Sequence, residues 1–301
     1  MFGLTILGNN SAIPAHDRHP TAQVLTFADQ VFLIDCGEGT QMQLAKYKVR
    51  RSKINHIFIS HLHGDHYYGL IGLVTSMGLM GRSLPLHIHG PADLEQIIRL
   101  QLSVGGNHLP YPIHFHAHPE KGGIILSDVK VEVSCFPVQH RITCHGFVFT
   151  EKRQPRKILK EAVLETLIPA AFYPRLQQGE NYTGKDGIVI KNTDVTIANT
   201  PGKTYAYSAD TVYDPSIVPH FTGADMLYHE TTFLAAETDR AAERFHSTTV
   251  QAADIAARAQ VKRLLIGHFS SRYENLDELL EEARPVFPHT DLALEGVTYR
   301  I

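Results

Sequence analysis

One stretch of six residues constrains this chain more than any other part of its sequence. Residues 61–66 read His-Leu-His-Gly-Asp-His and directly follow the short run Ile-Phe-Ile-Ser at 57–60. An apolar run that ends in such a segment is typical of a strand that delivers side chains into a loop at its carboxyl end. Imidazole and carboxylate groups suit zinc or a similar divalent ion, and four of them, with further ligands from elsewhere, exceed the needs of one tetrahedral ion. We therefore predict two ions. A histidine-rich surface loop is the alternative, which the spacing around Gly64 and Gly69 disfavours.

The composition excludes several other classes of protein. The 301 residues are 43% hydrophobic and carry a net charge of −3, which allows a sizeable core and excludes a globally basic nucleic-acid binder. Any nucleic acid must therefore be contacted through local patches. We find neither an amino-terminal signal nor an apolar run near the ~20 residues that a membrane span needs, so we expect a cytoplasmic protein that contacts no membrane. The cysteines are too scattered for a disulfide framework and are expected to be reduced core residues: Cys36, Cys135 and Cys144.

The amino-terminal part predicts an antiparallel meander. Three short strands are expected at 4–7, 24–27 and 31–34, separated by polar turns. Two glycines after the third strand predict a tight turn, and Thr40 is expected to cap a helix that runs to Lys46. Asp35 lies where this strand ends. It is interpreted either as a carboxylate that holds a metal-ligating histidine or as a turn residue.

The middle of the chain contains two features with open interpretations. Residues 70–80 are apolar on nearly every side, which indicates a buried helix or a subunit interface. A strand is expected at 129–136, with Val129, Val131 and Val133 on one face, and it leads to His140. Five further histidines alternate as on strands and are interpreted as strand-face or loop residues rather than ligands: His87, His89, His114, His116 and His118.

The last third repeats the pattern of ionisable residues beyond strand ends. Strands expected at 204–208, 226–228 and 263–266 lead to Asp210, to the pair His229-Glu230 and to His268. Between them, Ser247 or Thr248 is expected to cap an alanine-rich helix. Together with His140 and the stretch at 61–66, these residues predict one site at the ends of several strands.

Residues 151–192 differ in character from the rest. They contain eight Lys or Arg against five Asp or Glu in an otherwise mildly acidic chain, and their periodicity is weak. A solvated excursion is the plain interpretation, and a substrate-binding arm inserted into the domain is the functional one.

These motifs together resemble those of the RNase Z family within the metallo-β-lactamase superfamily, and the resemblance covers the whole chain. The histidine stretch indicates only the superfamily. The family is indicated by the segment between His140 and Asp210 and by three motifs: His229-Glu230-Thr231-Thr232, His246-Ser247-Thr248 and His268-Phe269-Ser270-Ser271-Arg272-Tyr273. The resemblance implies an α/β fold, an αββα sandwich of two mixed β-sheets flanked by helices. It implies a single domain over 1–301 with an inserted arm at 151–192.

The resemblance also implies a set of metal ligands. Two zinc ions per chain are expected, with Mn²⁺ or another divalent ion as an alternative. Carried over onto matching positions, the ligands are His61, His63 and His140 for one ion, Asp65, His66 and His268 for the other, and Asp210 as a bridge.

The same resemblance implies roles in catalysis. Asp65 would orient or deprotonate the attacking water, and the pair of Glu230 and His246 would supply the proton that a departing alkoxide needs. Phosphate oxygens would be held by Arg18, Ser270 and Arg272.

The implied activity is that of an endoribonuclease. It would cleave the 3′ trailer from precursor tRNA and leave a 3′-hydroxyl on the tRNA, with two ions ~3.5–4 Å apart acting on the attacking and leaving oxygens. The expected partners are precursor tRNA and a second copy of the chain, with no DNA. A metallo-hydrolase of small esters or cyclic nucleotides is the alternative, and a non-catalytic RNA-binding homologue is a third. The chain departs from the family pattern at residues 14–19, where a lysine is missing, and at 168–179, the tip of the arm.

Overall fold

The structure is a computed structural model that describes residues 2–27, 29–106, 108–152, 155–199 and 201–301. The chain divides into two compact units. The first comprises residues 1–127, 133–149 and 203–301, and the second comprises residues 128–132 and 150–202. Arg153, which counts toward the positive charge of residues 151–192, lies outside the described residues.

The first β-sheet of the larger unit begins with the predicted meander. Its strands, in spatial order, are β18 (Thr298–Arg300), β1 (Phe2–Gly8), β2 (Ala22–Phe27), β3 (Gln30–Ile34), β4 (Ile54–Phe58), β5 (Leu86–Gly90) and β6 (Ile113–Ala117). Strands β18 to β3 pair antiparallel, which confirms the meander, and β3 to β6 pair parallel. The parallel part carries the carboxyl end of β4, and hence the histidine stretch, to one edge of the sheet.

The second sheet has a parallel half of its own. Its order is β17 (Thr290–Leu292), β16 (Leu264–Gly267), β15 (Met226–Glu230), β14 (Thr204–Tyr207), β9 (Cys144–Glu151), β8 (Val131–Val138) and β7 (Gly123–Ser127). Strands β14 to β17 pair parallel, so that their carboxyl ends also meet at one edge.

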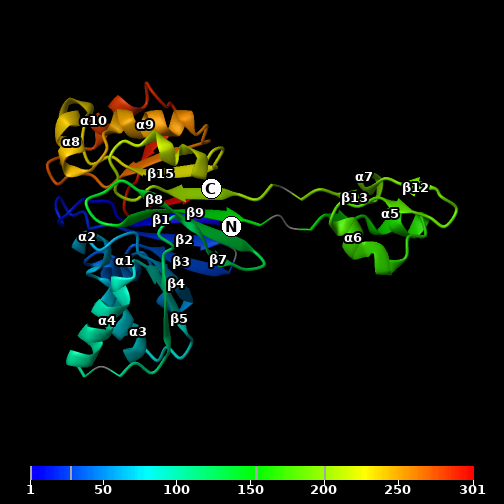
Figure 1. The fold of residues 1–301 in the computed structure, drawn as a ribbon, viewed down its shortest axis with the longest axis horizontal. Helices are drawn as coiled ribbons and strands as arrows, with labels where there is room; N and C mark the ends of the chain where they lie inside the picture. The colour runs from blue at the N-terminus through cyan, green and yellow to red at the C-terminus, as the bar shows by residue number, and fades with distance from the viewer. Residues whose placement is uncertain (1, 28, 107, 153–154, 200) are drawn as a thin grey trace. The chain divides into compact units, whose positions relative to one another are not determined.

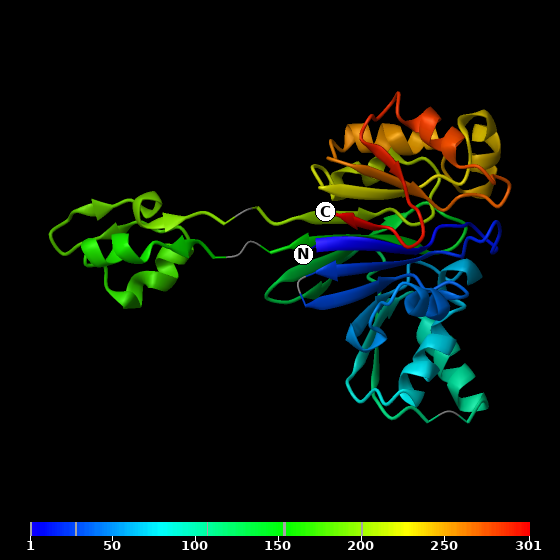
Figure 2. The same ribbon diagram turned by 180° about the vertical axis from the view of Figure 1, so that it is seen from behind.

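Helices flank both sheets in this unit (Figures 1 and 2). On the side of the first sheet lie α1 (Thr40–Lys46), η1 (Arg51–Lys53), α2 (Gly64–Tyr67), α3 (Leu70–Leu79) and α4 (Asp93–Val104). On the side of the second sheet lie η3 (Pro215–His220), η4 (Ala235–Glu237), α8 (Thr238–Arg244), α9 (Thr249–Arg258) and α10 (Asp277–Ala283). Each group of helices shares a buried apolar cluster with its sheet, as Leu73 and Val74 do with Ile57 and Ala256 with Leu264. The predicted αββα sandwich is confirmed.

Aromatic side chains fill the space between the two sheets. Phe58 on β4 meets Phe149 on β9 edge to face, with ring centroids 5.2 Å apart, and Phe32 on β3 lies 5.8 Å from the same ring. All three are buried. Such contacts bury large apolar areas and fix the sheets against each other, which holds the strand ends of both sheets in place at the shared edge.

Several local predictions can be checked against these elements. The prediction that Thr40 caps α1 is wrong, because the N-cap is Gly39 at φ 81° and the Thr40 hydroxyl donates to the carbonyl of Gly37. Val129 lies outside β8 and is 89% exposed, so its assignment to the buried strand face is also wrong. Thr248 caps α9 in a capping box with Gln251, as predicted. The three cysteines are free and buried, as expected.

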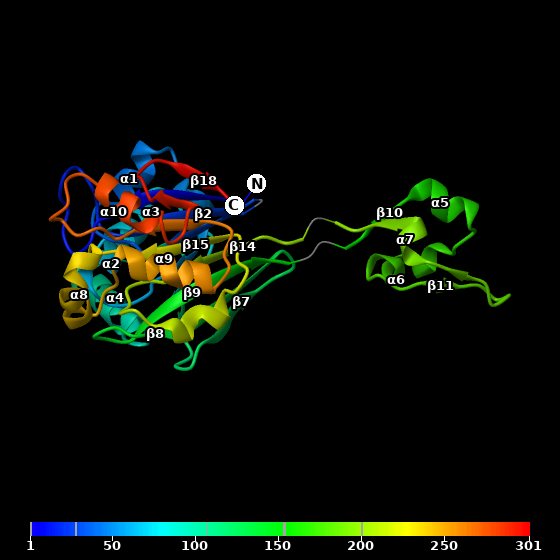
Figure 3. The same cartoon turned by 90° about the horizontal axis from the view of Figure 1, so that it is seen from above.

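The smaller unit has its own core. It contains the strand pair β10 (Lys157–Ile158) and β13 (Thr196–Ile197), the pair β11 (Tyr182–Thr183) and β12 (Val189–Ile190), and the helices α5 (Lys160–Glu165), η2 (Ala170–Phe172), α6 (Tyr173–Gln177) and α7 (Asn192–Val195) (Figure 3). These elements bury Val163, Ile168, Leu176 and Val195. Across the described parts of both units, no helix has the length and apolar character to cross a membrane.

Candidate metal centre

Two groups of ligand-type side chains meet at the shared edge of the two sheets. The first consists of His61, His63, His140 and Asp210, and the second of Asp65, His66, His268 and Asp210. In each group the candidate ligand atoms lie within 4.8 Å of one another. The structure thus brings together all seven residues predicted as ligands, with Asp210 common to both groups.

Close backbone packing shapes the loops that carry these residues. A Cβ on Gly37 would lie 2.4 Å from the carbonyl oxygen of Asp65, so only glycine fits beside the histidine stretch. Several non-glycine residues around the centre adopt positive φ, among them Asp35 at 54°, Ala209 at 58° and His268 at 59°. Backbone in this region is costly and concentrates at functional sites. The loops are therefore held in the conformation that the centre requires.

In four of these histidines, the ring nitrogen that points away from the centre, Nδ1, has a partner that sets the orientation of the ring. His66 Nδ1 lies 2.8 Å from Asp35 Oδ2, and His268 Nδ1 lies 2.9 Å from the Thr232 hydroxyl. The other two partners are the carbonyl oxygen of Phe245 for His140 and the Ser60 hydroxyl for His61. Because Nδ1 is engaged, Nε2 of each ring faces the centre. Asp35 is thus a buried carboxylate behind His66, which resolves its two interpretations.

The spacing of the inward nitrogens fits divalent cations. His61 Nε2 and His140 Nε2 each lie 3.0 Å from His63 Nδ1, and His66 Nε2 lies 3.3 Å from His268 Nε2. Two nitrogens bound to one tetrahedral ion at ~2.0–2.1 Å are separated by ~3.3 Å. The carboxylate of Asp210 lies 3.7 Å from His61 Nε2 and 3.3 Å from His66 Nε2. This set of donors could hold divalent metal ions.

The protonation states of the first group also suit a cation. Burial and the neighbouring imidazoles lower the pKa of His61 well below its usual value, and burial and His140 lower the pKa of His63 to about 4. Burial alone would raise the pKa of Asp210, but the imidazoles of His268 and His66 hold it well below its usual value. Neutral imidazoles and an ionised carboxylate are the forms that bind metals.

His66 behaves differently because three carboxylates surround it. Burial alone would lower its pKa, but Asp210, Asp65 and Asp35 raise it well above the usual value. The ring therefore favours positive charge at this position. A divalent cation held by His66 would supply that charge in place of the proton.

A second buried pair lies beside the metal ligands. His246 Nδ1 is 2.9 Å from Glu230 Oε1, although the two residues are 16 positions apart in the sequence. Burial alone would lower the pKa of His246, but Glu230 raises it to about 9. The Glu230 carboxylate also accepts hydrogen bonds from the backbone N–H groups of Thr211, Thr232 and Ser247. This carboxylate is fixed, and it holds a protonated imidazole next to the centre.

The residues predicted to bind phosphate all contact other groups of the protein in this structure. The guanidinium of Arg18 donates to Asn10 Oδ1 and to the carbonyl oxygens of Tyr273 and Glu274. Arg272 Nη1 lies 2.7 Å from both carboxylate oxygens of Glu237. Ser270 Oγ lies 3.4 Å from the backbone nitrogen of Arg272. Their role in substrate binding stays a prediction.

A cavity of about 390 Å³ opens onto the centre. It is lined by His63, Asp65, Asp210 and His246 from the centre, and also by Ser11, Ala12, Ile13, Pro14, Pro20, Glu38, Gly64, Tyr68 and Arg141. Sequence reasoning did not single out Ile13, Glu38, Tyr68 or Arg141. Tyr68 and Arg141 lie next to or near motif histidines in the sequence, which is the one signal that would have indicated them.

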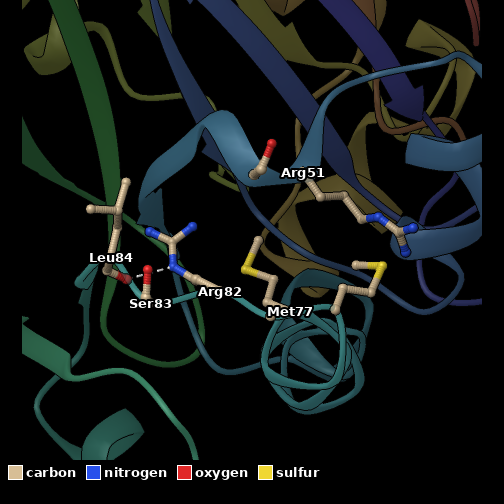
Figure 4. Close-up of a pocket in the computed structure, with 8 residues that line it drawn as sticks. Arg51, Met77, Arg82, Ser83 and Leu84 are labelled. Carbon is tan, nitrogen blue, oxygen red and sulfur yellow. Dashed lines mark hydrogen bonds between the residues drawn. The ribbon is translucent and has the colours of Figure 1, made fainter.

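A second cavity lies away from the centre, where α3 ends and β5 begins. Arg51, Met77, Met80, Arg82 and Leu84 contribute to its lining (Figure 4). The guanidinium of Arg82 donates to the carbonyl oxygens of Leu84, Ile54 and Pro85. Because its donors serve the backbone, Arg82 has a structural role there.

The alternating histidines occupy one face of neighbouring strands. His87 and His89 lie on β5, His114 and His116 on β6, and His118 just beyond β6. Their rings stack across the strands, as in the pair of His89 and His116 with centroids 4.6 Å apart. Within the described ranges they join none of the groups of three or more metal-ligand side chains. Their place on the strand faces agrees with the prediction.

Comparison with known proteins identifies the family. The Ribonuclease Z of Bacteroides fragilis is 44% identical over 297 residues, which cover 98% of this chain and 98% of that protein. The chain belongs to the Ribonuclease Z family. A protein-family profile described as Anti-Pycsar protein Apyc1 also matches residues 2–151, the part of the chain that contains the histidine stretch.

Solved structures agree with this assignment. The crystal structure of human tRNase Z, short form, superposes with a TM-score of 0.72 and 27% identity, over 99% of each chain. The metallo-β-lactamase fold protein YhfI from Bacillus subtilis reaches a TM-score of 0.71 at 21% identity, over 99% of this chain and 98% of that one. The αββα sandwich of this chain is therefore the metallo-β-lactamase fold.

Proposed function

We propose that this member of the Ribonuclease Z family is a metal-dependent endoribonuclease that removes the 3′ trailer from precursor tRNA and leaves a 3′-hydroxyl on the tRNA. The observation that carries the proposal is the pair of ligand groups joined by Asp210, with the separate pair of Glu230 and His246 beside it. The names of its relatives, Ribonuclease Z and tRNase Z, support the choice of substrate. Transfer RNA precursors are cytoplasmic in bacteria, so we place the enzyme there.

The cofactor we propose is a pair of zinc ions per chain. His61, His63 and His140 would hold one, Asp65, His66 and His268 the other, and Asp210 would bridge them. Two such ions supply a water of lowered pKa and neutralise charge on the attacking and leaving oxygens of an in-line displacement. The mixture of imidazole and carboxylate ligands favours zinc over magnesium, which prefers oxygen ligands alone.

The chain's own residues would handle the protons of the reaction. As the water oxygen forms its bond to phosphorus, the ionised carboxylate of Asp65 orients that water and accepts its proton. When the bond between phosphorus and the 3′-oxygen breaks, His246 gives its proton to that oxygen and yields the 3′-hydroxyl. The Glu230 carboxylate, 2.9 Å from His246 Nδ1, stabilises the protonated ring and directs Nε2 outward.

Phosphate binding is proposed for Ser270, Arg272 and Arg18. Arg272 is exposed and would exchange the carboxylate oxygens of Glu237 for oxygens of a phosphate. Arg18 bonds the amino-terminal loop to the loop that follows His268, and it would act on the substrate mainly by holding these loops.

The proposed function is tested by cleavage of a precursor tRNA that carries a 3′ trailer. We expect about two divalent ions per chain by metal analysis, and we expect His63→Ala and Asp210→Ala to abolish cleavage because each removes a ligand from the centre. Arg258→Ala, a substitution of an exposed residue on α9, is the matched control and should cleave normally. Full activity after removal of metal by a chelator would contradict the proposal.

The same protein preparation tests the alternative, which is a hydrolase of small esters or cyclic nucleotides. An enzyme that hydrolyses a cyclic nucleotide or a small ester efficiently, but leaves the precursor tRNA intact, belongs to that alternative. A product with a 3′-phosphate on the tRNA would also exclude the chemistry proposed here, because the 3′-oxygen would then not have been the leaving group.

We also propose that the enzyme is a homodimer. Four large apolar side chains are exposed on or next to α3: Met42, Leu79, Met80 and Leu84. The sequence indicated residues 70–80, which include α3, as a possible subunit interface. Sedimentation analysis should give twice the mass of the chain. Leu79→Glu should shift the protein to the monomer, because it places charge in an apolar contact.

A further inference from the structure

The mouth of the active-site cavity contains an arginine that the motifs do not include. Arg141 directly follows the proposed ligand His140 and lines the cavity. Its loop is fixed at both sides, since the N–H of Val212 donates to the carbonyl of Gln139 and the N–H of His145 donates to the carbonyl of Ser60. The position of Arg141 relative to the centre is therefore set by the same backbone that positions His140.

Arg141 differs from the other arginines near the centre in having its donors available. Arg18 and Arg272 are bonded to carbonyl and carboxylate oxygens of the protein. Arg141 is exposed, and among the residues that the structure describes it makes no hydrogen bond or ion pair. It is also the one guanidinium in the lining of this cavity, within the same described residues. A free guanidinium beside a phosphodiesterase centre presents a bidentate donor to phosphate.

The rest of the mouth fits an RNA strand better than a small anion. Tyr68 is 65% exposed and Ile13 is 55% exposed, and both line the cavity. Gly64 limits the movement of the Tyr68 ring, because the ring packs so closely on it that a Cβ at position 64 would lie 2.2 Å from the ring. An exposed aromatic side chain and a cation that line the same cavity are the combination by which proteins hold single-stranded nucleic acid without reading its sequence.

We propose that Arg141 forms a subsite for a backbone phosphate of the RNA next to the scissile phosphate, with Tyr68 as the neighbouring surface for a base or ribose. This rests on the proposed function, since it assigns the strand of precursor tRNA to the cavity. The scissile phosphate itself would belong at the ligand groups around Asp210, where the proposed cations would offset the carboxylates. Arg141 lies at the exposed edge of the cavity, so its charge is available to the next phosphate along the strand.

The test compares Arg141→Ala and Arg141→Lys with the wild type at several salt concentrations. For precursor tRNA, we expect kcat/KM of Arg141→Ala to fall at least tenfold at low salt. The slope of log(kcat/KM) against log[salt] should become shallower by roughly 0.7–1, the value for the loss of one phosphate contact. Arg141→Lys should restore most of the slope. With bis(p-nitrophenyl) phosphate, which has a single phosphate, the loss should be much smaller.

Arg258→Ala is the control for the loss of one positive charge. Arg258 is an exposed guanidinium on α9 that pairs with Asp254, outside the cavity lining. It should leave both the rate and the salt slope unchanged. Metal content of all variants is measured in parallel, because Arg141 neighbours a proposed ligand.

Three outcomes would overturn the subsite. An unchanged slope and rate in Arg141→Ala would remove Arg141 from RNA binding. Equal losses on both substrates would place Arg141 on the scissile phosphate, and a loss of metal would assign it to the support of His140. If the wild type itself fails to cleave the precursor, the proposed function falls and the subsite falls with it, whereas cleavage by the wild type together with a silent Arg141→Ala refutes the subsite alone.

Discussion

The partner on the outer nitrogen decides how each histidine of the centre can act. A free imidazole can present either nitrogen, and its ring can rotate. The carboxylate of Asp35, which also accepts hydrogen bonds from the Ser60 and Tyr207 hydroxyls, fixes the ring of His66. Because Asp35 is completely buried, water screens its charge only weakly, and the charge acts strongly on that ring. The residues behind the proposed ligands would therefore contribute to the affinity for a metal, as the ligands themselves would.

At this scale we predict that Asp35→Asn weakens metal binding. The asparagine keeps the shape of the side chain but loses the negative charge that orients and polarises His66, and such changes typically cost 10–100-fold in affinity. Competition with a chelator measures the loss directly. Tyr207→Phe is the matched control, because it removes one hydrogen bond to Asp35 and leaves the charge in place. Equal affinities in Asp35→Asn and the wild type would contradict the prediction.

The pair of Glu230 and His246 gives a second prediction for single residues. His246→Ala should slow cleavage of RNA 10²–10⁴-fold, the usual contribution of a general acid. It should slow hydrolysis of a p-nitrophenyl ester much less, because nitrophenolate leaves without a proton. Glu230→Gln should show the same dependence on the leaving group. Both variants are compared at equal metal content. Similar factors on the two substrates would mean that His246 does not donate the proton.

The sequence predicted which ligand-type side chains meet at the centre better than it predicted the residues that support them. Ligand types in a short, ordered stretch are visible in a sequence, and the resemblance supplied the distant members such as His140. The partners behind them are ordinary side chains, such as Thr232 behind His268 and the Tyr207 hydroxyl on Asp35. Tyr207 and Asp35 are 172 positions apart. Only the packing of the two sheets brings them together. The place of Asp35 at a strand end indicated its role as one of two interpretations, but no local pattern indicated Tyr207.

At the scale of elements, the parallel strands explain why distant residues meet. In the second sheet, Glu230 is the last residue of β15, where it pairs with Gly267 at the end of β16. Asp210 follows β14, which pairs with β15 in parallel. Carboxyl ends of adjacent parallel strands lie side by side. The alternation of strands and helices was visible in the sequence, and it predicted this edge correctly.

The opposite ends of the same strands are joined by one carboxylate. Asp225, which precedes β15, lies 2.9 Å from Lys203 Nζ and 2.8 Å from Lys262 Nζ, and it accepts a hydrogen bond from the N–H of Thr204. Burial alone would raise the pKa of Asp225, but these donors lower it below the usual value. The ionised carboxylate thus stabilises the start of three neighbouring strands.

We predict that Asp225→Asn lowers the free energy of unfolding by about 1 kcal/mol at neutral pH, a modest value because both ammonium groups are exposed. A lowered folded-state pKa means that this stabilisation is complete above the unfolded pKa of ~3.9 and is lost as the pH falls through the folded value. Urea unfolding at pH 7 and in acid should therefore show a gap between wild type and variant that closes below about pH 4. Asp239→Asn, an exposed carboxylate on α8, is the control. A gap independent of pH would refute the role of the charge.

Errors in the predicted elements occurred where neighbours outweigh local preference. Thr40 has the residue type of a helix cap, but Gly39 takes the left-handed conformation, and the threonine hydroxyl turns back to Gly37. Val129 has the type and spacing of a strand residue, but the strand begins at Val131. Both positions lie at the border of an element, where one or two backbone bonds decide the structure.

At the scale of the whole molecule, the second unit has the properties of an insertion that can be removed. Its core of Val163, Ile168, Leu176 and Val195 is its own. The two ends of the insertion are adjacent, because Gly202 packs so closely on Glu151 that a Cβ there would lie 2.0 Å from the Glu151 carbonyl oxygen. A short linker can therefore join them while β9 and β14 stay in place.

The last prediction uses this property to separate the arm from the catalytic centre. Replacing residues 153–200 by a short Gly-Ser linker should leave metal content near the wild-type value and should lower kcat/KM for precursor tRNA far more than for bis(p-nitrophenyl) phosphate. The reason is the positive charge of residues 151–192, which would contact phosphates of the tRNA remote from the centre. The salt dependence of precursor cleavage should weaken in parallel, because fewer phosphate contacts mean that fewer counterions are released when the RNA binds. A second variant, Lys157→Glu with Lys160→Glu, keeps the arm and reverses two charges. If it reproduces much of the loss, charge is the cause, whereas equal losses of both substrates in the deletion would remove the arm from tRNA recognition.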